Sequence, residues 1–214
     1  LPRIVPRGQT SLVEATVSPV LFNYLSQVTN TLGEITRLKI MGSSGCLLSP
    51  NQLLAKDTIL SGPAGGMVGS VAALSDCGLN HLPLIGFDMG GTSTDVFYVP
   101  PGKNIDWERH SETEVGGHQL MAQRLPIHTV AAGGGSIIST KNGRLQVGPN
   151  SAGANPGPAC YRRNGPLTIT DANVLLGRIQ LETFPALFGP SGNQKIDISI
   201  VKKRFTNIAK NVNC

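Results

Sequence analysis

The sequence contains few cysteines, and none of them is paired in a metal-binding motif. The four cysteines at positions 46, 77, 160 and 214 are widely spaced, with no CxxC. This spacing disfavours both a zinc site and a disulfide scaffold, and it is typical of a reduced, cytoplasmic chain. The histidines at positions 81, 110 and 118 are isolated and lack metal-ligand spacing.

Long apolar runs and dense charge are missing as well. No stretch approaches twenty apolar residues and no signal peptide is present, so we expect no membrane-spanning segment. Charged residues make up 14% of the chain, and the formal net charge is only +5. Basic residues cluster only at 162–163 and 202–204, which are more simply interpreted as solvated surface than as a nucleic-acid stripe.

Glycine and proline, by contrast, are abundant, with 26 and 15 residues in a chain of 214. They cluster without a period, which excludes collagen and predicts many tight loops. Hydrophobic residues, at 40%, are sufficient to bury a core, and the length fits one large domain or two small ones. Because the first residue is leucine rather than methionine, we expect an internal fragment of a longer protein.

Two helices are predicted in the first third of the chain. Apolar spacing within residues 11–32 predicts a helix from about Ser18, with Pro19 in its first position. Residues 61–76, SGPAGGMVGSVAALSD, predict a helix capped by Ser61 with a face of small residues. Each glycine inside a helix costs about 1 kcal/mol relative to alanine, so we expect another element or a ligand to approach this face closely.

The rest of the chain predicts short strands, glycine loops and two later helices. A helix near 172–179 is expected to be capped by Thr170 or Asp171, and the tail is expected to become helical near Ser199. The other predicted elements are strands at 37–41, 83–88 (buried) and 95–100, a short helix after Pro50, a strand, glycine turn and strand or helix within 127–138, and a short strand followed by a loop within 144–161.

The most informative stretch is IGFDMGGTSTDV, residues 85–96. A glycine turn between two strands exposes backbone N–H groups that can bind an anion, and glycine leaves room for a phosphate group. The hydroxyls at positions 92, 93 and 94 add donors. Asp88, at the end of the first strand, can hold Mg²⁺ or its waters. The pattern therefore favours a magnesium-bound polyphosphate.

A plain hairpin with a capped turn is the simpler alternative. It explains the glycines and Asp95, but it explains Asp88 poorly, because an acid that follows an apolar strand must be paired or solvated. The stretch is neither a GxxxxGK[ST] phosphate loop, since no lysine follows, nor a GxGxxG dinucleotide turn.

Five motifs taken together resemble the hydantoinase A and 5-oxoprolinase family, within the ATPase superfamily of actin, hexokinase and heat-shock proteins. In order, over about residues 60–190, they are SGPAGGMVGS, GFDMGGTSTDV, HTVAAGGGS, GPNSAGANPGPACY and LTITDANVLLGRI. The segments GPACYRRNGPLTITDAN and FPALFGP look closer to the 5-oxoprolinase branch than to bacterial hydantoinase subunits.

The resemblance implies an α/β fold with ribonuclease H-like ATPase lobes that are incomplete in this chain. Residues 1–60 would end the first lobe, 61–80 would form the helix between lobes, 81–190 would belong to the second lobe, and 191–214 would begin a further segment or tail. The superfamily's first phosphate motif and its late adenosine-binding segment are not found in this sequence.

The resemblance also implies ATP and Mg²⁺ as cofactors. Asp88 and His128 are the expected catalytic residues, with Asp88 also holding Mg²⁺ through ATP. The expected nucleotide contacts are Asp88, Gly90, Gly91, Thr92, Ser93, Thr94, Gly65, Gly66, Gly133 and Gly134.

Several of these residues have simpler alternatives. His128 alone is more often a satisfied core or loop residue than a catalyst. Residues 133–136 fit a second anion nest, a lobe hinge or a plain glycine turn. Cys160 is more simply a buried structural cysteine than a nucleophile, and Asp171 more simply a helix cap than a site residue.

The implied reaction is ATP-dependent opening of a small cyclic amide, with 5-oxo-L-proline, ATP and water giving L-glutamate, ADP and phosphate. The alternatives are an ATP-dependent hydantoinase subunit and an inactive fragment that acts only through protein contacts. The motifs GPAGG and GPACY argue against a sugar kinase or heat-shock ATPase. The expected partners are a lactam substrate and either a second copy of the chain or a B-type region or subunit, with no nucleic acid and no membrane.

Overall fold

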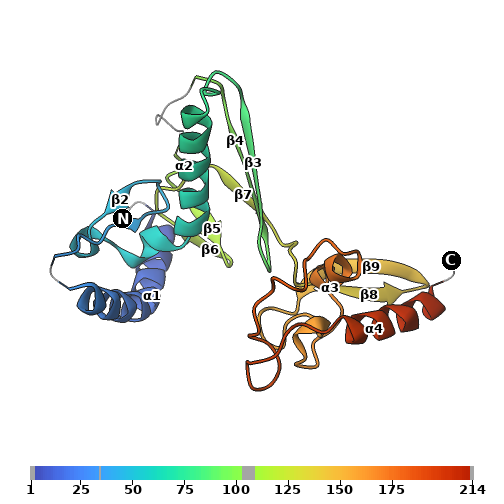
Figure 1. Ribbon diagram of the computed structural model, residues 1–214. Coiled ribbons are helices and arrows are strands. Elements are labelled where there is room, and N and C mark those ends of the chain that lie inside the picture. The colour runs from blue at the N-terminus through green and yellow to red at the C-terminus, as the bar shows by residue number, and fades with distance from the viewer. Residues whose placement is uncertain (1–2, 34, 103–108, 213–214) are drawn as a thin grey trace. The chain divides into compact units, whose positions relative to one another are not determined.

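The computed structural model describes residues 3–33, 35–102 and 109–212 (Figure 1). The chain divides into two compact units. Unit 1 comprises Leu1–Gly86 and Val96–His128, and unit 2 comprises Phe87–Asp95 and Thr129–Cys214. Both contain helices and short strands, so the predicted mixture of helix and sheet is confirmed. Among the helices of these described ranges, none has both the length and the apolar character needed to cross a membrane.

Unit 1 begins with a long helix and continues with short strands around a second helix. Its elements are α1 (Ile4–Leu32), β1 (Ile40–Met41), β2 (Leu47–Leu48), the 3-10 turns η1 (Pro50–Gln52) and η2 (Ala55–Thr58), α2 (Ser61–Asp76), β5 (Thr113–Val115) and β6 (His118–Leu120). The strands β3 (Leu84–Met89), β4 (Thr94–Val99) and β7 (Ile127–Val130) form one sheet in the order β3-β4-β7, and the chain passes between the units within this region.

The first helix starts earlier than its sequence predicts. It begins at Ile4, so Pro19 lies in its interior instead of its first turn. Tertiary contacts stabilise the half that precedes the proline. Glu14 accepts hydrogen bonds from the N–H groups of Ala55 (3.1 Å) and Lys56 (2.7 Å). The Thr10 hydroxyl accepts another from the Met121 N–H at 2.9 Å. These partners lie far away in the sequence, so local spacing could not reveal them.

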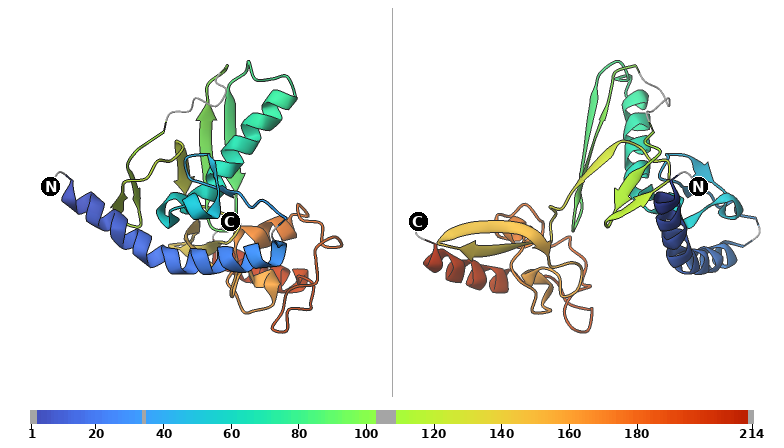
Figure 2. Two further views of the ribbon diagram at one scale, coloured as in Figure 1. Left: turned by 90° about the vertical axis from the view of Figure 1, so that its left-hand side faces the viewer. Right: turned by 180° about the vertical axis from the view of Figure 1, so that it is seen from behind.

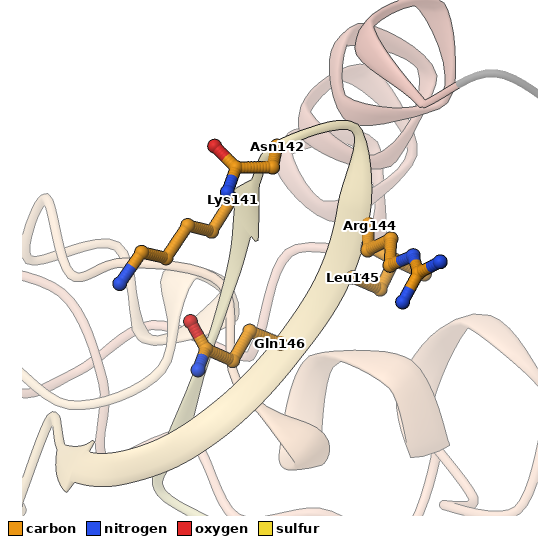
Figure 3. A pocket seen from close by; sticks show the side chains of 5 residues that line it. All are labelled: Lys141, Asn142, Arg144, Leu145 and Gln146. Atoms are coloured by element: carbon orange, nitrogen blue, oxygen red, sulfur yellow. The ribbon is translucent and has the colours of Figure 1, made fainter.

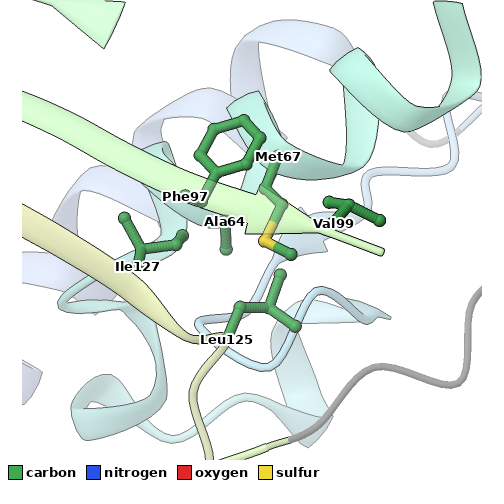
Figure 4. Close-up of a cluster of buried hydrophobic side chains, with 6 residues drawn as sticks. All are labelled: Ala64, Met67, Phe97, Val99, Leu125 and Ile127. Atoms are coloured by element: carbon green, nitrogen blue, oxygen red, sulfur yellow. The ribbon is translucent and has the colours of Figure 1, made fainter. Parts of the chain in front are cut away.

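The core of unit 1 forms where α2 packs against apolar side chains from β4, β7 and the segment just before β7 (Figure 4). Its buried members are Ala64, Met67, Phe97, Val99, Leu125 and Ile127. The predicted helix over 61–76 is confirmed, but its cap is not Ser61. The N-cap residue is Leu60, which makes no side-chain cap, and Ser61 is the first helical residue.

The strand predicted as buried, PLIGFD, is covered on one face only. Gly86 is buried beneath Phe97, and a Cβ built at Gly86 would lie 2.0 Å from the Phe97 ring. On the alternate positions, Ile85 is 73% exposed and Phe87 is 70% exposed. The prediction of a fully buried strand is therefore wrong, because the apolar run has a covering element on one side only within the described residues.

Unit 2 contains a hairpin, a 3-10 turn and two helices. These elements are β8 (Ser136–Lys141), β9 (Arg144–Ser151), η3 (Ala159–Tyr161), α3 (Ile169–Leu175) and α4 (Ile198–Asn211). The two strands pair antiparallel, with an irregularity between Ser136 and Ile138. Helix α4 runs along the hairpin (Figure 2). Its Ile200, Phe205 and Ile208 pack against the buried cluster of Ile138, Ala159 and Leu167. The open choice after the glycine turn of 133–135 is thus resolved in favour of a strand.

Both helices of unit 2 have side-chain caps. Helix α4 begins close to its predicted position, and the Asp197 side chain accepts from the N–H groups of Ser199 and Ile200. Helix α3 begins earlier than predicted. Its cap is Thr168, which forms a capping box with Asp171, so neither Thr170 nor Asp171 occupies the cap position itself.

Candidate functional site

The turn between β3 and β4 is the centre of the candidate site. The Gly90 N–H donates to the Ser93 carbonyl at 2.9 Å and leaves Gly91 and Thr92 at the tip. Both tip residues are exposed, and Ser93 is half-buried. Within the described part of unit 2, the N–H groups of Gly91 and Thr92 have no hydrogen-bond partner.

A second glycine turn packs directly against the first. The Gly134 N–H donates to the Gly90 carbonyl at 3.0 Å, and the Gly135 N–H donates to the Gly91 carbonyl at 2.6 Å. A Cβ built at Gly133 would lie 2.7 Å from the carbonyl carbon of Gly91. Glycine is needed at these positions because no side chain fits between the turns.

The contact between the turns answers the question that the sequence leaves open about residues 133–136. The Gly133 N–H is bonded to the Ser136 hydroxyl at 2.9 Å, and the next two N–H groups are bonded to the first turn. All three N–H groups are therefore engaged within the protein. The geometry favours a supporting role for Gly133 and Gly134 over an independent anion nest.

This support also orients the first turn. In a planar trans peptide, the C=O and the following N–H point in opposite directions. Because the carbonyls of Gly90 and Gly91 face the second turn, the N–H groups of Gly91 and Thr92 must point away from it. The tip therefore presents two successive N–H donors side by side, an arrangement suited to the oxygens of a phosphate group.

The predicted hydroxyl donors separate into two kinds. Thr92 lies at the exposed tip, whereas Thr94 is 5% exposed and its hydroxyl donates to the Ala132 carbonyl at 2.6 Å. Nearby, the Thr129 hydroxyl donates to the Asp95 carboxylate at 2.6 Å. Thr94 and Asp95 thus tie β4 to the segment around the second turn, and Thr92 and Ser93 are the hydroxyls left nearest to the tip.

Asp88 lies near the end of β3, two residues before the turn, and it is exposed. The residues that the structure describes contain no group of three His, Cys, Asp or Glu side chains able to hold a metal ion by themselves. A magnesium ion at Asp88 would therefore depend on ligands that this part of the chain does not supply, such as water and phosphate oxygens.

Three other predicted site residues belong to unit 1. His128 is exposed on β7. Gly65 makes only ordinary contact with Met41, whose Cγ would lie 3.8 Å from a Cβ built at Gly65. A Cβ at Gly66 would meet no described atom within 4 Å. The close approach of another element, expected for the glycine face of α2, is therefore not observed within the described residues.

Asp171 and Cys160 have structural roles. The fully buried Asp171 carboxylate accepts from the N–H groups of Ala159 (3.0 Å), Cys160 (2.8 Å) and Thr168 (2.8 Å), and from the Thr168 hydroxyl (3.1 Å). It therefore joins the start of α3 to η3. Burial, followed by the charge of Asp171, raises the pKa of the Cys160 thiol far above its ordinary value. A buried, protonated thiol agrees with the structural interpretation of Cys160.

Two surface hollows of unit 2 lie away from the predicted site residues. One is formed by the end of the β8–β9 hairpin (Figure 3) and is lined by Lys141, Asn142, Arg144, Leu145 and Gln146. Another is lined by Asn155, Arg162, Arg163, Asn164 and Pro190. Neither includes a residue predicted for the site. The guanidinium groups in the second are already bonded to backbone carbonyls, as in the Arg162 Nε contact with Lys195 at 2.8 Å.

Comparison with known proteins gives a consistent result. The family described as Hydantoinase/oxoprolinase matches residues 7–214. The 5-oxoprolinase of Saccharomyces cerevisiae is 44% identical over 213 residues, which are 99% of this chain and 16% of the yeast protein. This chain thus spans only about a sixth of that relative.

Two solved structures are similar to most of the chain. A nucleotide-free structure of acetone carboxylase has a TM-score of 0.71 and 25% identity, covering 88% of this chain and 26% of the other. An ATP-dependent caprolactamase from Pseudomonas jessenii has a TM-score of 0.64 and 30% identity, covering 97% of this chain and 32% of the other.

Proposed function

Because the chain belongs to the hydantoinase/oxoprolinase family, we propose that it is a segment of an ATP-dependent cyclic-amide hydrolase and carries part of the ATP phosphate site. The observation that supports this most directly is the turn at Gly91 and Thr92. It directs two N–H groups outward, close in sequence to the exposed carboxylate of Asp88.

The proposed reaction opens 5-oxo-L-proline to L-glutamate as ATP is converted to ADP and phosphate. The names of two relatives, 5-oxoprolinase and caprolactamase, support a cyclic amide as the substrate class. An ATP-dependent hydantoinase activity is the alternative within the same family. The non-enzymatic alternative is a catalytically inactive segment that acts only through contacts with other proteins.

The chemistry explains why such a hydrolase needs a phosphate site. A five-membered lactam is a poor electrophile, and ATP supplies a phosphoryl group that turns its carbonyl oxygen into a leaving group. Water then attacks the carbonyl carbon, and the ring C–N bond breaks as its nitrogen is protonated. A second water hydrolyses the resulting acyl phosphate and releases phosphate. The protein's task in phosphoryl transfer is positioning and charge neutralisation. The Gly91 and Thr92 N–H groups would neutralise phosphate oxygens, and Asp88 would hold Mg²⁺ or its waters.

The other predicted site residues have different roles in this proposal. Thr92 and Ser93 add hydroxyl donors near the tip. Thr94, Gly133 and Gly134 hold the tip in place through the contacts between the two turns. On α2, the nucleotide contacts Gly66, which no described atom covers, and its half-buried neighbour Gly65, which packs against Met41. His128 acts in catalysis.

Location and partners rest on the family resemblance alone. We propose a cytoplasmic protein that assembles with a second copy or with a B-type region or subunit. The hydrolytic step of the reaction is then assigned to that B-type region, and the phosphorylation step to the region that contains this chain.

Calorimetric titration of Mg-ATP into the chain tests the phosphate site. We expect binding in the sub-millimolar range, weakened at least tenfold by Asp88→Asn and by Asp88→Ala. Asp76→Asn is the matched control, because Asp76 is an exposed aspartate at the end of α2, and it should leave the affinity unchanged. Absence of binding by a chain that circular dichroism shows to be folded would contradict the proposal, as would equal affinities for the Asp88 and Asp76 variants.

A further inference from the structure

We propose that Thr170 is a positioning residue for the phosphate turn and acts through a relay of hydrogen-bonded peptide groups. This inference rests on the proposed function of the turn. Thr170 itself lies on α3 and contacts the second glycine turn, not the first. Its effect on the tip must therefore pass through Gly134 and Gly135.

The relay contains three bonded groups in succession. Both the N–H and the hydroxyl of Thr170 donate to the Gly134 carbonyl, at 2.8 and 2.9 Å. These two bonds fix the orientation of the peptide group that joins Gly134 to Gly135. The N–H of that peptide group, which belongs to Gly135, points opposite to the Gly134 carbonyl and donates to the Gly91 carbonyl at 2.6 Å. The next peptide is fixed in turn, so that the Thr92 N–H points outward.

A parallel relay runs beside the first and does not include Thr170. The Ser136 N–H donates to the Gly133 carbonyl at 3.0 Å, and the Gly134 N–H donates to the Gly90 carbonyl at 3.0 Å. This second relay orients the Gly91 N–H. The molecule therefore contains its own internal control, because loss of the Thr170 hydroxyl affects the first relay directly and the second only indirectly.

Two physical effects give Thr170 influence over the tip. Each bond in such a chain polarises the next, by about 10–30% per bond, so a stronger donor at the start makes the last N–H a better donor. The first group of the relay is also held rigidly, because Thr170 lies between Thr168 and Asp171, the two residues of the α3 capping box. A Cβ at Gly134 would lie 2.8 Å from the Thr170 hydroxyl, which shows how closely the two segments meet.

The test compares Thr170→Val with Thr170→Ser in the full chain. Valine keeps the shape and the backbone N–H of threonine but removes the hydroxyl donor, whereas serine keeps the donor. In ¹⁵N-labelled protein without nucleotide, Thr170→Val should shift the amide protons of Gly135 and Thr92 upfield, and those of Gly134 and Gly91 much less. Thr170→Ser should restore the wild-type positions.

Mg-ATP affinity provides the second readout. Loss of one hydrogen bond corresponds to a roughly 2- to 10-fold weaker affinity for Thr170→Val, and Thr170→Ser should stay within about twofold of wild type. Thr183→Val is the matched control, because the Thr183 hydroxyl also donates to a backbone carbonyl of unit 2, that of Gln180 at 3.0 Å, outside the relay. It should change neither readout.

The outcomes separate this inference from the proposed function. Unchanged amide shifts at Gly135 and Thr92 in folded Thr170→Val overturn the relay, and so do equal shifts in both relays, which indicate general loosening. If the first relay alone shifts but wild-type protein binds no Mg-ATP, the relay is supported and the phosphate function is contradicted.

Discussion

Glycine serves opposite purposes in two regions of this protein. In the second glycine turn, Cβ atoms built at Gly133 and Gly135 would lie 2.7 and 2.8 Å from backbone atoms of the first turn. On α2, Cβ atoms built at Gly66 and Gly69 would meet no described atom within 4 Å. None of these four residues has a left-handed φ, so backbone conformation explains neither group.

The difference shows what each region is adapted to. Packing within unit 2 fully accounts for the turn glycines. On α2, Gly66 and Gly69 lower stability and gain no contact among the described residues, which is the pattern expected where function and stability conflict. Their purpose is therefore to be sought in a ligand or in another protein segment. Substitutions in the two regions should accordingly have opposite effects.

The largest effect is expected for Gly133→Ala. The added methyl group would meet the backbone of Gly91, which cannot move without breaking the bonds between the turns. Overpacking of this kind destabilises a protein by about 1–3 kcal/mol, and we expect the upper part of that range. Urea denaturation monitored by circular dichroism measures the change. A loss below about 0.5 kcal/mol would show that the turns do not pack as closely as described.

Gly91→Ala should separate folding from binding. A Cβ at Gly91 would meet no described atom within 4 Å, and its φ is not left-handed, so the free energy of unfolding should change by less than about 0.5 kcal/mol. The methyl group would instead crowd the outward N–H groups and weaken Mg-ATP binding at least tenfold, about 1.4 kcal/mol. Unchanged affinity in calorimetry would argue that phosphate does not bind at this tip.

The two glycine turns show which features of the candidate site the sequence alone could predict. The pattern DMGGTSTD predicts the turn between β3 and β4, and the turn is present. The contact that orients it joins Gly90 and Gly91 to residues more than forty positions later, and nothing in the local pattern reveals such a pairing. The sequence predicts Thr170 only as a helix cap, because its bond to Gly134 depends on the same tertiary contact.

The helices also differ in how well the sequence predicts where they begin. For α4, the predicted start near Ser199 is correct within about one residue, and the helix is capped by the adjacent Asp197. For α1, the sequence signal at Pro19 gives the wrong start, because Thr10 and Glu14 bond to partners at Met121 and η2. Local signals suffice where a helix is stabilised by its own residues, and they fail where distant residues stabilise it.

Removal of the α4 cap should have an intermediate, pH-dependent effect. Burial acts to raise the pKa of Asp197, but hydrogen bonds from Ser199 and Ile200 and the charge of Arg162, 2.8 Å away, outweigh it and lower the pKa. The ionised form is therefore favoured in the folded state. Its contribution to stability is present above the unfolded pKa, near 4, and is lost as the pH falls through the folded value.

At pH 7 we therefore expect Asp197→Ala to reduce the free energy of unfolding by about 1 kcal/mol. The difference from wild type should shrink below about pH 4, as urea denaturation at pH 7 and pH 3 would measure. Asp197→Asn is the matched variant, because asparagine also caps helices but carries no charge. It should retain most of the stability and lose the pH dependence. An equal deficit at both pH values would show that the ionised carboxylate is not what stabilises α4.

The smallest effects, and the only stabilising ones, are expected on α2. Gly66→Ala and Gly69→Ala should each raise the free energy of unfolding by about 0.5–1 kcal/mol, because alanine favours the helix and space is open at both positions. The two residues lie three positions apart on one exposed strip, but only Gly66 is a predicted nucleotide contact. Gly66→Ala should therefore weaken Mg-ATP binding while Gly69→Ala leaves it unchanged. If both variants are stabilised and bind equally well, the uncovered strip serves a protein surface instead of the nucleotide.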